Sequence, residues 1–573
     1  MDKEKVKPNV IKGLQGSTRH DQLNVIKAIE YAGTIHGYRE VVTRMPGYWH
    51  RYTYRDMLGR VRRLASALKS LGVEPGDIVG IWSSSNTYRN VELAGAIPGL
   101  GAISGIVNFT LPEDDIIYML NHAIDHAPYK LAFVEDDPLT LMKYELIVPR
   151  LKKPFEKYII IGDSEKTVAT ATKPAGFTED LIKNASEITE WPEIDEYAAA
   201  WYMGTSATTG RPKALLHTHR GMWLQCTGQA LTYGLSPMDT ILVLPPFTHG
   251  GFLFHLTATM VGAKMVLTGP MPKASDWADC LIKERVTFTG GVPTMFVMIL
   301  DDIRQRQSRG EKVDLSGLKI LFAGQAPSEA LIDAYQDLGA SCIQGYAYSE
   351  GCGPEVVSYV PRPLEKESMS PAEYRRFLCE SSGYPCLGVE VKIIGENNEE
   401  LPRDGKSIGE IHAKIPWGVD EYWMMPEETK KGFDENGWLK SGDLGSVDAH
   451  GCIRLHDRVK DAIKSGGEWI SSSNIEGLIC SFTPVSEACV VEVEHEKWGG
   501  RPVALVTLRS ESKGKITERD IKEYLQKKVE TGEIAKFHIP DKIFIVDEID
   551  KTPNMKFDKK VIRDRYRKVL LGK

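Results

Sequence analysis

Apolar side chains recur at helical spacing between residues 54 and 71. The spacing predicts an amphipathic helix whose apolar face is formed by Met57, Val61, Leu64, Leu68 and Leu71. Gly72 is a typical residue to end such a helix. A Pro-Gly-Asp turn at 75–77 follows, and the apolar run 78–82 predicts a buried strand. Helix, turn and short apolar strand together indicate an α/β unit.

The same unit recurs along the first two thirds of the chain. Helical spacing at 277–283 precedes a strand-like run at 286–288, and helical spacing at 331–338 precedes one at 341–344. Short strands between helices predict mostly parallel sheets. The apolar run 94–109 contains Pro98 and four glycines and is too short to cross a bilayer, so we expect a buried turn between a helix and a strand.

The pattern changes near residue 385. Period-two alternation at 389–394 and close turn signals at 396–398 and 403–405 predict a small β-rich subdomain at about 385–457. After about residue 458 the pattern is α+β, with more charge. We therefore predict an α/β protein with a large N-terminal domain, 1–457, and a small α+β domain, 458–573.

Composition narrows the class of protein. The chain has 573 residues, 42% hydrophobic and 26% charged, which is typical of a soluble globular protein. Its net charge of −7 argues against a nucleic-acid partner, since phosphates require a basic surface. None of the nine cysteines forms a CxxC pair, and the N-terminus lacks the apolar core of a signal peptide. We expect a cytoplasmic protein with no transmembrane segment.

The segment 202–213, Tyr-Met-Gly-Thr-Ser-Ala-Thr-Thr-Gly-Arg-Pro-Lys, is the richest in candidate chemistry. Small hydroxyl residues and glycine turn N–H and O–H groups toward an anion, and Lys213 adds a positive charge. The segment does not have Walker A spacing, because Arg211-Pro212 separates Gly210 from Lys213. Composition alone would also fit a polar surface loop.

The order of residues in this segment resembles the phosphate loop of the adenylate-forming superfamily, which comprises acyl-CoA synthetases, peptide-synthetase adenylation domains and firefly luciferases. The family pattern is TSGTTGxPKG, and this chain has Ala207 and Ala214 where glycine is usual. Further motifs follow in family order. They are AGQAP at 323–327, QGYAYSE at 344–350, WLKSGD at 438–443, DRVKDAIKSGG at 457–467 and KTPNMK at 551–556.

The resemblance implies a binding site for ATP and Mg²⁺. The implied phosphate contacts are Thr205, Ser206, Thr208, Thr209, Gly210 and Lys213, with Ser349 on the α-phosphate. The implied nucleoside contacts are the adenine turn Gly324, Gln325, Ala326 and Pro327, the aromatic ring of Tyr346, and Asp443 and Arg458 on the ribose. Glu350 is the expected magnesium ligand, because Mg²⁺ takes few protein carboxylates and completes its shell with phosphate and water. Outside these motifs, a core tyrosine or a surface ion pair would be the ordinary interpretation.

The C-terminal motifs imply two half-reactions. Lys556 is the expected catalytic residue of adenylation, since a lysine offsets the repulsion between a carboxylate and the α-phosphate; in a tail with nine basic residues and two acidic ones, it could otherwise be a solvated cation. Lys460 resembles the hinge about which the C-terminal domain moves to admit coenzyme A. Gly467 resembles the glycine beside the pantetheine arm, and an ordinary surface turn is the alternative for both.

His249 stands near the position where relatives carry an aromatic or histidine beside the acyl carboxylate, and a loop histidine explains it nearly as well. Candidate lining residues of the acyl pocket include no Arg or Lys, which favours an apolar monocarboxylic acid. They are Phe247, Gly250, Gly251, Phe252, Val292, Pro293, Thr294 and the stretch 345–354. The whole-chain pattern is most similar to AMP-forming medium- and long-chain fatty acyl-CoA synthetases.

Three alternatives remain open at this point. The enzyme could load a carrier protein or another acceptor in place of CoA, although no carrier domain follows in the chain. A luciferase-type oxygenase is open by family alone. A nucleotide-binding module without catalysis would fit the departures at Ala207, Gln325, Ala347 and Met555, while Lys213, Glu350, Asp443, Arg458 and Lys556 argue against it. The small-molecule partners are an acid, ATP and CoA, and a homodimer is open by resemblance.

Overall fold

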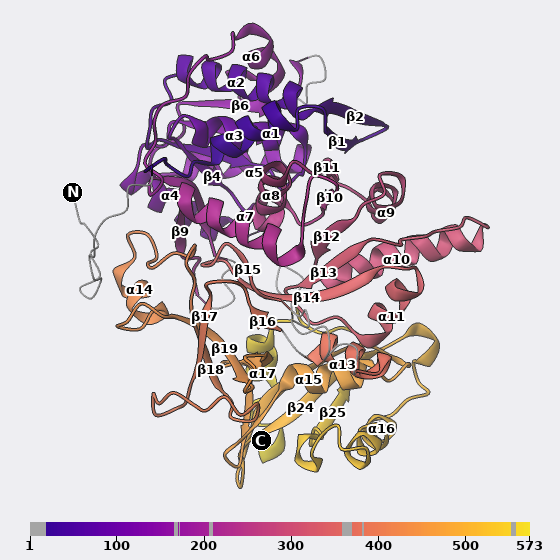
Figure 1. Cartoon of the computed structure of the whole chain (residues 1–573). Coiled ribbons are helices and arrows are strands. Elements are labelled where there is room, and N and C mark those ends of the chain that lie inside the picture. The colour runs from indigo at the N-terminus through magenta and orange to yellow at the C-terminus, as the bar shows by residue number, and fades with distance from the viewer. Residues whose placement is uncertain are drawn as a thin grey trace.

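The protein is described from a computed structural model, which covers residues 19–109, 111–164, 170, 172–205, 210–357, 369–380, 383–551 and 557–572. The strands form four sheets (Figure 1), and the second sheet combines residues 40–53 with strands from the middle of the chain. The purple sheet lies at the top of the view, the magenta sheet with its indigo edge at residues 40–53 lies beside and below it, and the orange and yellow sheets lie at the bottom.

The first sheet is parallel except for its last strand, which pairs antiparallel with its neighbour. Its order is β7 (Gly176–Phe177), β6 (Lys157–Ile161), β5 (Leu131–Glu135), β3 (Ile78–Trp82), β4 (Ile103–Ile106), β8 (Ala199–Gly204) and β9 (Ala214–Thr218).

The second sheet is parallel through its middle and antiparallel at both edges. Its order is β16 (Tyr384–Pro385), β15 (Gly353–Val357), β14 (Ser341–Tyr348), β13 (Lys319–Ala323), β12 (Phe288–Gly291), β10 (Thr240–Val243), β11 (Lys264–Leu267), β1 (Glu40–Met45) and β2 (Tyr48–Thr53).

The two smaller sheets follow in the last third of the chain. A fully antiparallel sheet contains β17 (Glu390–Ile394), β18 (Gly409–Lys414), β19 (Leu439–Val447) and β20 (Ile453–Arg458). The last sheet contains β22 (Glu468–Ile470), β21 (Ile463–Ser465), β24 (Gly499–Leu508), β23 (Val485–His495) and β25 (Lys542–Ile545), which pairs parallel with β24.

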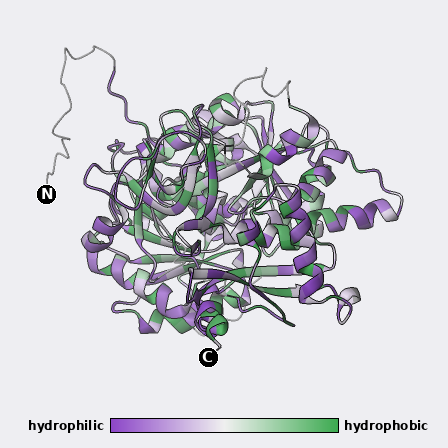
Figure 2. Ribbon diagram, turned by 90° about the horizontal axis from the view of Figure 1, so that it is seen from below, coloured by the Kyte–Doolittle hydropathy of each residue, from purple (hydrophilic) through white to green (hydrophobic). Residues whose placement is uncertain are grey.

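Helices cover the faces of these sheets. In the large domain they are α1 (Val25–Ile35), α2 (Tyr54–Ser70), α3 (Tyr88–Gly99), α4 (Glu113–His126), α5 (Pro138–Ile147), α6 (Thr178–Asn184), α7 (His219–Tyr233), α8 (Phe252–Val261), α9 (Ala274–Lys283), α10 (Pro293–Ser308), α11 (Glu329–Asp337), α13 (Pro371–Glu380) and α14 (Pro426–Gly432). The last sheet carries α15 (Ser472–Cys480), α16 (Glu518–Glu530) and α17 (Lys559–Tyr566). Figure 2 shows purple and green alternating along the peripheral helices, as expected for helices with one buried face.

The predicted α/β class, with mostly parallel sheets, a small β-rich subdomain and a small C-terminal domain, is confirmed. The helix predicted at 54–71 is α2, begun by a Thr53–Asp56 capping box and buried on the predicted face. The run 94–109 holds the end of α3 and all of β4, so it is buried as expected. The proposed boundary at 457/458 remains a prediction.

Two strand predictions need correction. The strand predicted at 286–288 begins only at Phe288. The strand predicted at 341–344 continues to Tyr348 as β14, because β13 and β15 pair with it on its two sides. This extension matters, since it places the 344–348 part of a chemistry-bearing motif on a paired strand.

The hydrophobic cores divide unevenly. One buried cluster runs from Val25 to Ile453 and joins the first sheet to the β-rich subdomain, and a second covers the other face of the second sheet. The last sheet has two small clusters of its own, one on each face. Within the described ranges, no helix combines the length and the apolarity needed to cross a membrane.

Candidate active site

The predicted phosphate loop is the connection of a β-hairpin. It joins β8 to β9, and the Thr205 N–H donates to the Lys213 carbonyl at 2.9 Å while the Lys213 N–H donates to Thr205 Oγ1 at 3.0 Å. Gly210 has φ +86°, which favours glycine. Ser206, Thr208 and Thr209 lie outside the described residues. Strand β9 follows Lys213 directly.

A short chain of polar contacts links this loop to Glu350. The Lys213 ammonium lies 4.5 Å from the centre of the Tyr422 ring and 3.4 Å from its hydroxyl oxygen. That hydroxyl donates to Glu350 Oε1 at 2.6 Å. Burial and the Glu350 carboxylate raise the pKa of Tyr422, so its hydroxyl stays a neutral donor. Lys213 and Glu350, 137 residues apart in the chain, thus share one tyrosine.

Sequence reasoning missed Tyr422. Tyr422 lies in the sequence Asp-Glu-Tyr-Trp at 420–423, which matches none of the motifs above. The run reaches the loop because the Trp423 N–H donates to the Ala214 carbonyl at 2.9 Å, beside Lys213. Nothing in the local pattern foretells that tertiary contact.

The predicted nucleoside contacts assemble on three strands. The Tyr346 hydroxyl donates to Asp443 Oδ2 at 2.6 Å, and Arg458 Nε lies 3.5 Å from Asp443 Oδ1. Tyr346 stands on β14, and Asp443 and Arg458 are direct partners across β19 and β20. Burial raises the pKa of Asp443, while the Tyr346 hydrogen bond and the Arg458 charge oppose the rise. Tyr346 is 8% exposed and packs edge-on against Tyr348.

The predicted adenine turn lies next to this group. Gly324, at φ +80°, follows β13 directly, and β13 pairs with β14 so that Ala323 is opposite Gly345. Gln325 and Ala326 are exposed and Pro327 is buried. The turn therefore stands at the carboxyl edge of a parallel sheet, which is where open α/β sheets bind ligands.

Ser349 and Glu350 form the turn after β14. Behind it stands His217 of β9, which is 1% exposed; burial lowers the pKa of this histidine to about 4, and the backbone of Ser349 opposes that shift. His217 is accordingly neutral near pH 7. His217 lies outside all of the sequence motifs.

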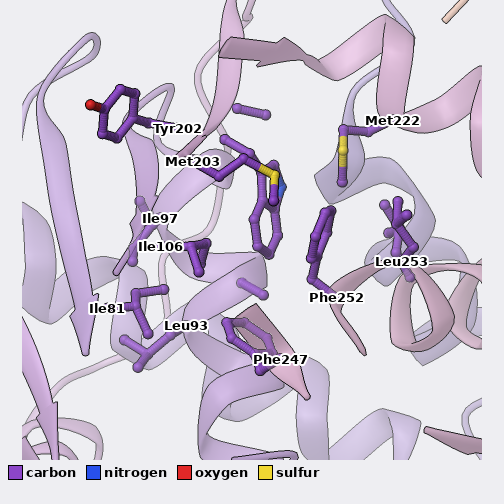
Figure 3. Packing of buried hydrophobic residues seen from close by; sticks show 14 of the residues in the cluster. Ile81, Leu93, Ile97, Ile106, Tyr202, Met203, Met222, Phe247, Phe252 and Leu253 are labelled. Carbon is purple, nitrogen blue, oxygen red and sulfur yellow. The ribbon is translucent and has the colours of Figure 1, made fainter. Parts of the chain in front are cut away.

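His249 lies on a π-helical turn, Phe247–Gly251, that leads into α8. The His249 side chain is exposed to solvent. Such turns often occur at functional sites. Phe247 and Phe252, expected in the acyl pocket and labelled in Figure 3, are each 1% exposed. Both rings pack against Trp201. Val292 and Thr294 are exposed. The structure brings Phe247 and Phe252 into the core and leaves His249 at its surface.

The predicted hinge follows β20 directly. The Lys460 carbonyl accepts a hydrogen bond from Arg563 Nη2 of α17 at 2.9 Å, and the same guanidinium lies 3.2 Å from Asp461 Oδ1. Gly466 and Gly467 are the two central residues of the β21–β22 hairpin, with φ +62° and +96°. A Cβ added at Gly467 would meet no atom within 4 Å.

Lys556 lies outside the described residues. Its flanking residues Lys551 and Phe557 form a β-bridge, and the Lys551 ammonium pairs with Glu487 at 2.6 Å. Not every lysine of the basic tail is solvated, because the Lys559 side chain is only 14% exposed and pairs with Glu476 at 2.8 Å. The tail is therefore anchored on both sides of the predicted catalytic lysine.

The fold is that of adenylate-forming enzymes. The solved structure of the anthranilate CoA ligase AuaEII in complex with anthranoyl-AMP superposes with a TM-score of 0.78, at 22% identity over 96% of this chain and 98% of that chain. The family model for the AMP-binding enzyme matches residues 31–423, and the model for the AMP-binding enzyme C-terminal domain matches residues 474–556. The chain belongs to the AMP-binding enzyme family.

Curated relatives are similar over nearly their whole length. A long-chain-fatty-acid–CoA ligase of Thermus thermophilus is 33% identical over 96% of this chain and 96% of its own. A medium-chain-fatty-acid–CoA ligase of Ectopseudomonas oleovorans is 30% identical over 97% of this chain and 98% of its own. The predicted superfamily is confirmed, and so is the predicted class of AMP-forming acid–CoA ligase.

Proposed function

We propose that this enzyme joins a carboxylic acid to ATP as an acyl-adenylate, releasing pyrophosphate, and then transfers the acyl group to the thiol of CoA, releasing AMP. The observation that carries the proposal is the convergence of the motif residues. Lys213 and Glu350 meet through Tyr422, and Tyr346 and Arg458 meet at Asp443. One group suits the phosphates and the other suits the nucleoside.

The phosphate side combines a cation with a metal ligand. The Tyr422 hydrogen bond uses Oε1 of Glu350 and leaves Oε2 without a partner among the described residues. That oxygen fits a Mg²⁺ ion, which would neutralise phosphate charge and help orient the phosphates. Lys213 adds a second positive charge next to the loop. Both anionic substrates are thereby drawn to one place, and Lys556 would stabilise the charge that develops as the carboxylate oxygen attacks the α-phosphorus.

The nucleoside side can grip the ribose. Asp443 accepts from Tyr346 at Oδ2, while Oδ1 lies toward Arg458. A ribose hydroxyl could donate to Oδ1, and a second could accept from the guanidinium. Adenine would then lie toward the exposed residues of the 324–327 turn and the Tyr346 ring.

The second half-reaction requires the C-terminal domain to move. We place the hinge at Lys460 and the domain boundary at 457/458, where β20 ends. Across this boundary the Asp457 carboxylate accepts two hydrogen bonds from Ser472, at 2.6 Å each, and these bonds would have to exchange when the domain rotates. Rotation would bring the Gly466–Gly467 hairpin to the acyl-adenylate, and the open space around Gly467 would admit the pantetheine arm.

The acid is proposed to be a monocarboxylate with an apolar body, of medium or long chain length. Two relatives at 30% identity or more are named for such acids. Core aromatic residues around Trp201 also adjoin the π-turn that carries His249. An apolar surrounding suits an acyl chain and would reject a second charge.

The test is AMP release from ATP and Mg²⁺ over acids from acetate to palmitate and one aryl acid, with and without CoA. CoA-dependent release with one class of acid supports the proposal and names the substrate. Pyrophosphate release that does not depend on CoA would instead favour a carrier protein or another molecule as the acyl acceptor. Absence of any acid-dependent release, in protein that still binds ATP, would contradict the proposal and favour a nucleotide-binding module.

A further inference from the structure

Two glutamine side chains on α7 are buried with hydrogen-bonding groups left over. Gln225 is 1% exposed, and neither its Oε1 nor its Nε2 has a hydrogen-bond partner among the described residues. Gln229, one turn further on, is 3% exposed; its Oε1 accepts from Thr257 Oγ1 at 3.0 Å, while its Nε2 lacks a partner in the same set.

Both amides point at the backbone of Gly353. A Cβ added to Gly353 would lie 2.3 Å from Gln225 Nε2 and 3.2 Å from Gln229 Nε2. Gly353 begins β15, only three residues after Glu350. A second contact ties the same segments together, because Cys352 Sγ lies 3.5 Å from Met222 Sδ. The amides therefore stand directly behind the turn that carries Ser349 and Glu350.

No described residue gives the Gln225 amide a hydrogen-bond partner that would explain a glutamine at this position. Met222, Phe252 and Leu253 line the contact between α7 and α8 (Figure 3), and Cys226 next to Gln225 is fully buried. Glutamine is rarely buried in full, and an unpaired buried amide costs about 1–3 kcal/mol. Methionine has nearly the same shape and would remove that cost. A group from outside the protein would remove it as well.

An acyl-adenylate is placed to supply such a group. In the proposed binding mode its phosphate would lie at Ser349 and Glu350, so its acyl part would begin at that turn and pass residues 351–353. No side chain at position 353 separates it from the amides. Whichever way the Gln225 amide is turned, it presents one N–H₂ donor and one carbonyl acceptor.

We infer that Gln225 hydrogen-bonds a polar substituent of the acid, with Gln229 held by Thr257 as a second contact, and that the substrate is an apolar monocarboxylic acid bearing a hydroxyl, oxo or amide group. This inference rests on the proposed function and narrows its substrate class. An unsubstituted alkyl acid would leave both amides unpaired. A site built to hydrogen-bond a substituent discriminates strongly against the analogue that lacks it.

The test compares acids that differ in one substituent. Octanoate is paired with its hydroxy and oxo derivatives and with its ω-amide, and phenylpropanoate with hydroxyphenylpropanoate. For each pair, kcat/KM of CoA-dependent AMP release is measured in the wild type, in Gln225→Met and in Gln229→Met. Leu231→Met, at an exposed position of the same helix, is the matched control.

We expect the wild type to prefer the substituted member of at least one pair by about 10- to 100-fold. Gln225→Met should bring that ratio near unity by gaining activity on the plain acid and losing it on the substituted one, which loss of folding cannot mimic. Leu231→Met should keep the wild-type ratio. The inference is overturned if the wild type prefers the plain acid in every pair, or if Gln225→Met keeps the preference. Absence of AMP release with every acid would contradict the proposed function itself, which is a separate outcome.

Discussion

The nucleotide side of the large domain and the hinge side of the C-terminal domain are built differently. On the nucleotide side, Tyr346 and Asp443 are 8% and 9% exposed and bonded to each other. On the hinge side, the Lys464–Glu396 ion pair between the two domains lies at the surface, and the hydrogen bonds from Ser472 to Asp457 form a buried link. The hydrophobic clusters of the C-terminal sheet belong to that sheet alone.

This difference teaches how binding and movement are separated. Buried, mutually bonded groups keep one geometry, because leaving any of them unpaired is costly. Exposed ion pairs contribute little and are screened by salt, so breaking them to rotate a domain is cheap. In the proposed mechanism, the large domain holds ATP and the C-terminal domain presents first Lys556 and then Gly467.

The sharpest test of this division is Lys556→Ala. Removing one charge that stabilises the transition state should slow adenylation by about 10²- to 10³-fold. Thioester formation from supplied acyl-AMP should change by less than about threefold. In the proposed mechanism, Lys556 acts only in the domain orientation that serves adenylation. ATP–pyrophosphate exchange measures the first step, and acyl-CoA formation from acyl-AMP the second. Lys560→Ala, at an exposed position of the same tail, is the control. Undiminished adenylation in Lys556→Ala would make the assignment wrong.

Acidification should lower the stability of the large domain more than that of the C-terminal domain. Burial lowers the pKa of His217 and His219 to about 4 and that of His255 to about 3, all in the large domain. In the unfolded chain these histidines become protonated near pH 6.5, whereas in the folded protein they stay neutral down to their lowered pKa values. Their contribution to the free energy of unfolding is therefore fully present above about pH 6.5 and is lost as the pH falls toward 4 and 3. Each histidine contributes about 3–5 kcal/mol.

Calorimetry as a function of pH should therefore show the large domain losing stability before the C-terminal domain, whose His538 is only partly buried. His255→Phe should reduce the pH dependence, because His255 already stacks on Phe247 and phenylalanine carries no proton. Parallel loss in both domains would count against this account.

Tyr422→Phe probes the contact between Lys213 and Glu350. It deletes a hydroxyl bonded to a carboxylate, an interaction worth about 1.5–3 kcal/mol, so adenylation should fall by about 10- to 100-fold. The Mg²⁺ concentration for half-maximal rate should change as well, because the orientation of Glu350 is released. Tyr197→Phe, at an exposed position, should leave both unchanged. A variant with normal rate and normal Mg²⁺ dependence would remove Tyr422 from the site.

Lys460→Pro should have the smallest effect of the four. Proline restricts the backbone at the hinge, so we expect thioester formation to fall about tenfold more than adenylation. The ratio of the two rates, from the same paired assays, is the readout. Equal losses in both steps would show that the substitution disturbs packing and does not limit rotation.

Much of the candidate site was predictable because its motifs are local. The phosphate loop, the 344–350 segment and the Asp443 and Arg458 positions could each be identified from short residue patterns. Tyr422 and Gln225 could not. The role of each depends on a tertiary contact, of Tyr422 with Glu350 and of Gln225 with Gly353. In both cases the partner is more than 70 residues away in the chain.

The sequence by itself determined the elements and their kind. Helical spacing defined α2, continuous apolar runs defined the parallel strands, and the order of motifs identified the family. Only the tertiary structure decided which of these elements meet: it buried Phe247 and Phe252 in the core, left His249 exposed, and set two amides against a glycine. The physical reason is that periodicity reports whether a residue is buried in its own element, whereas partners are set by packing between elements distant in the chain.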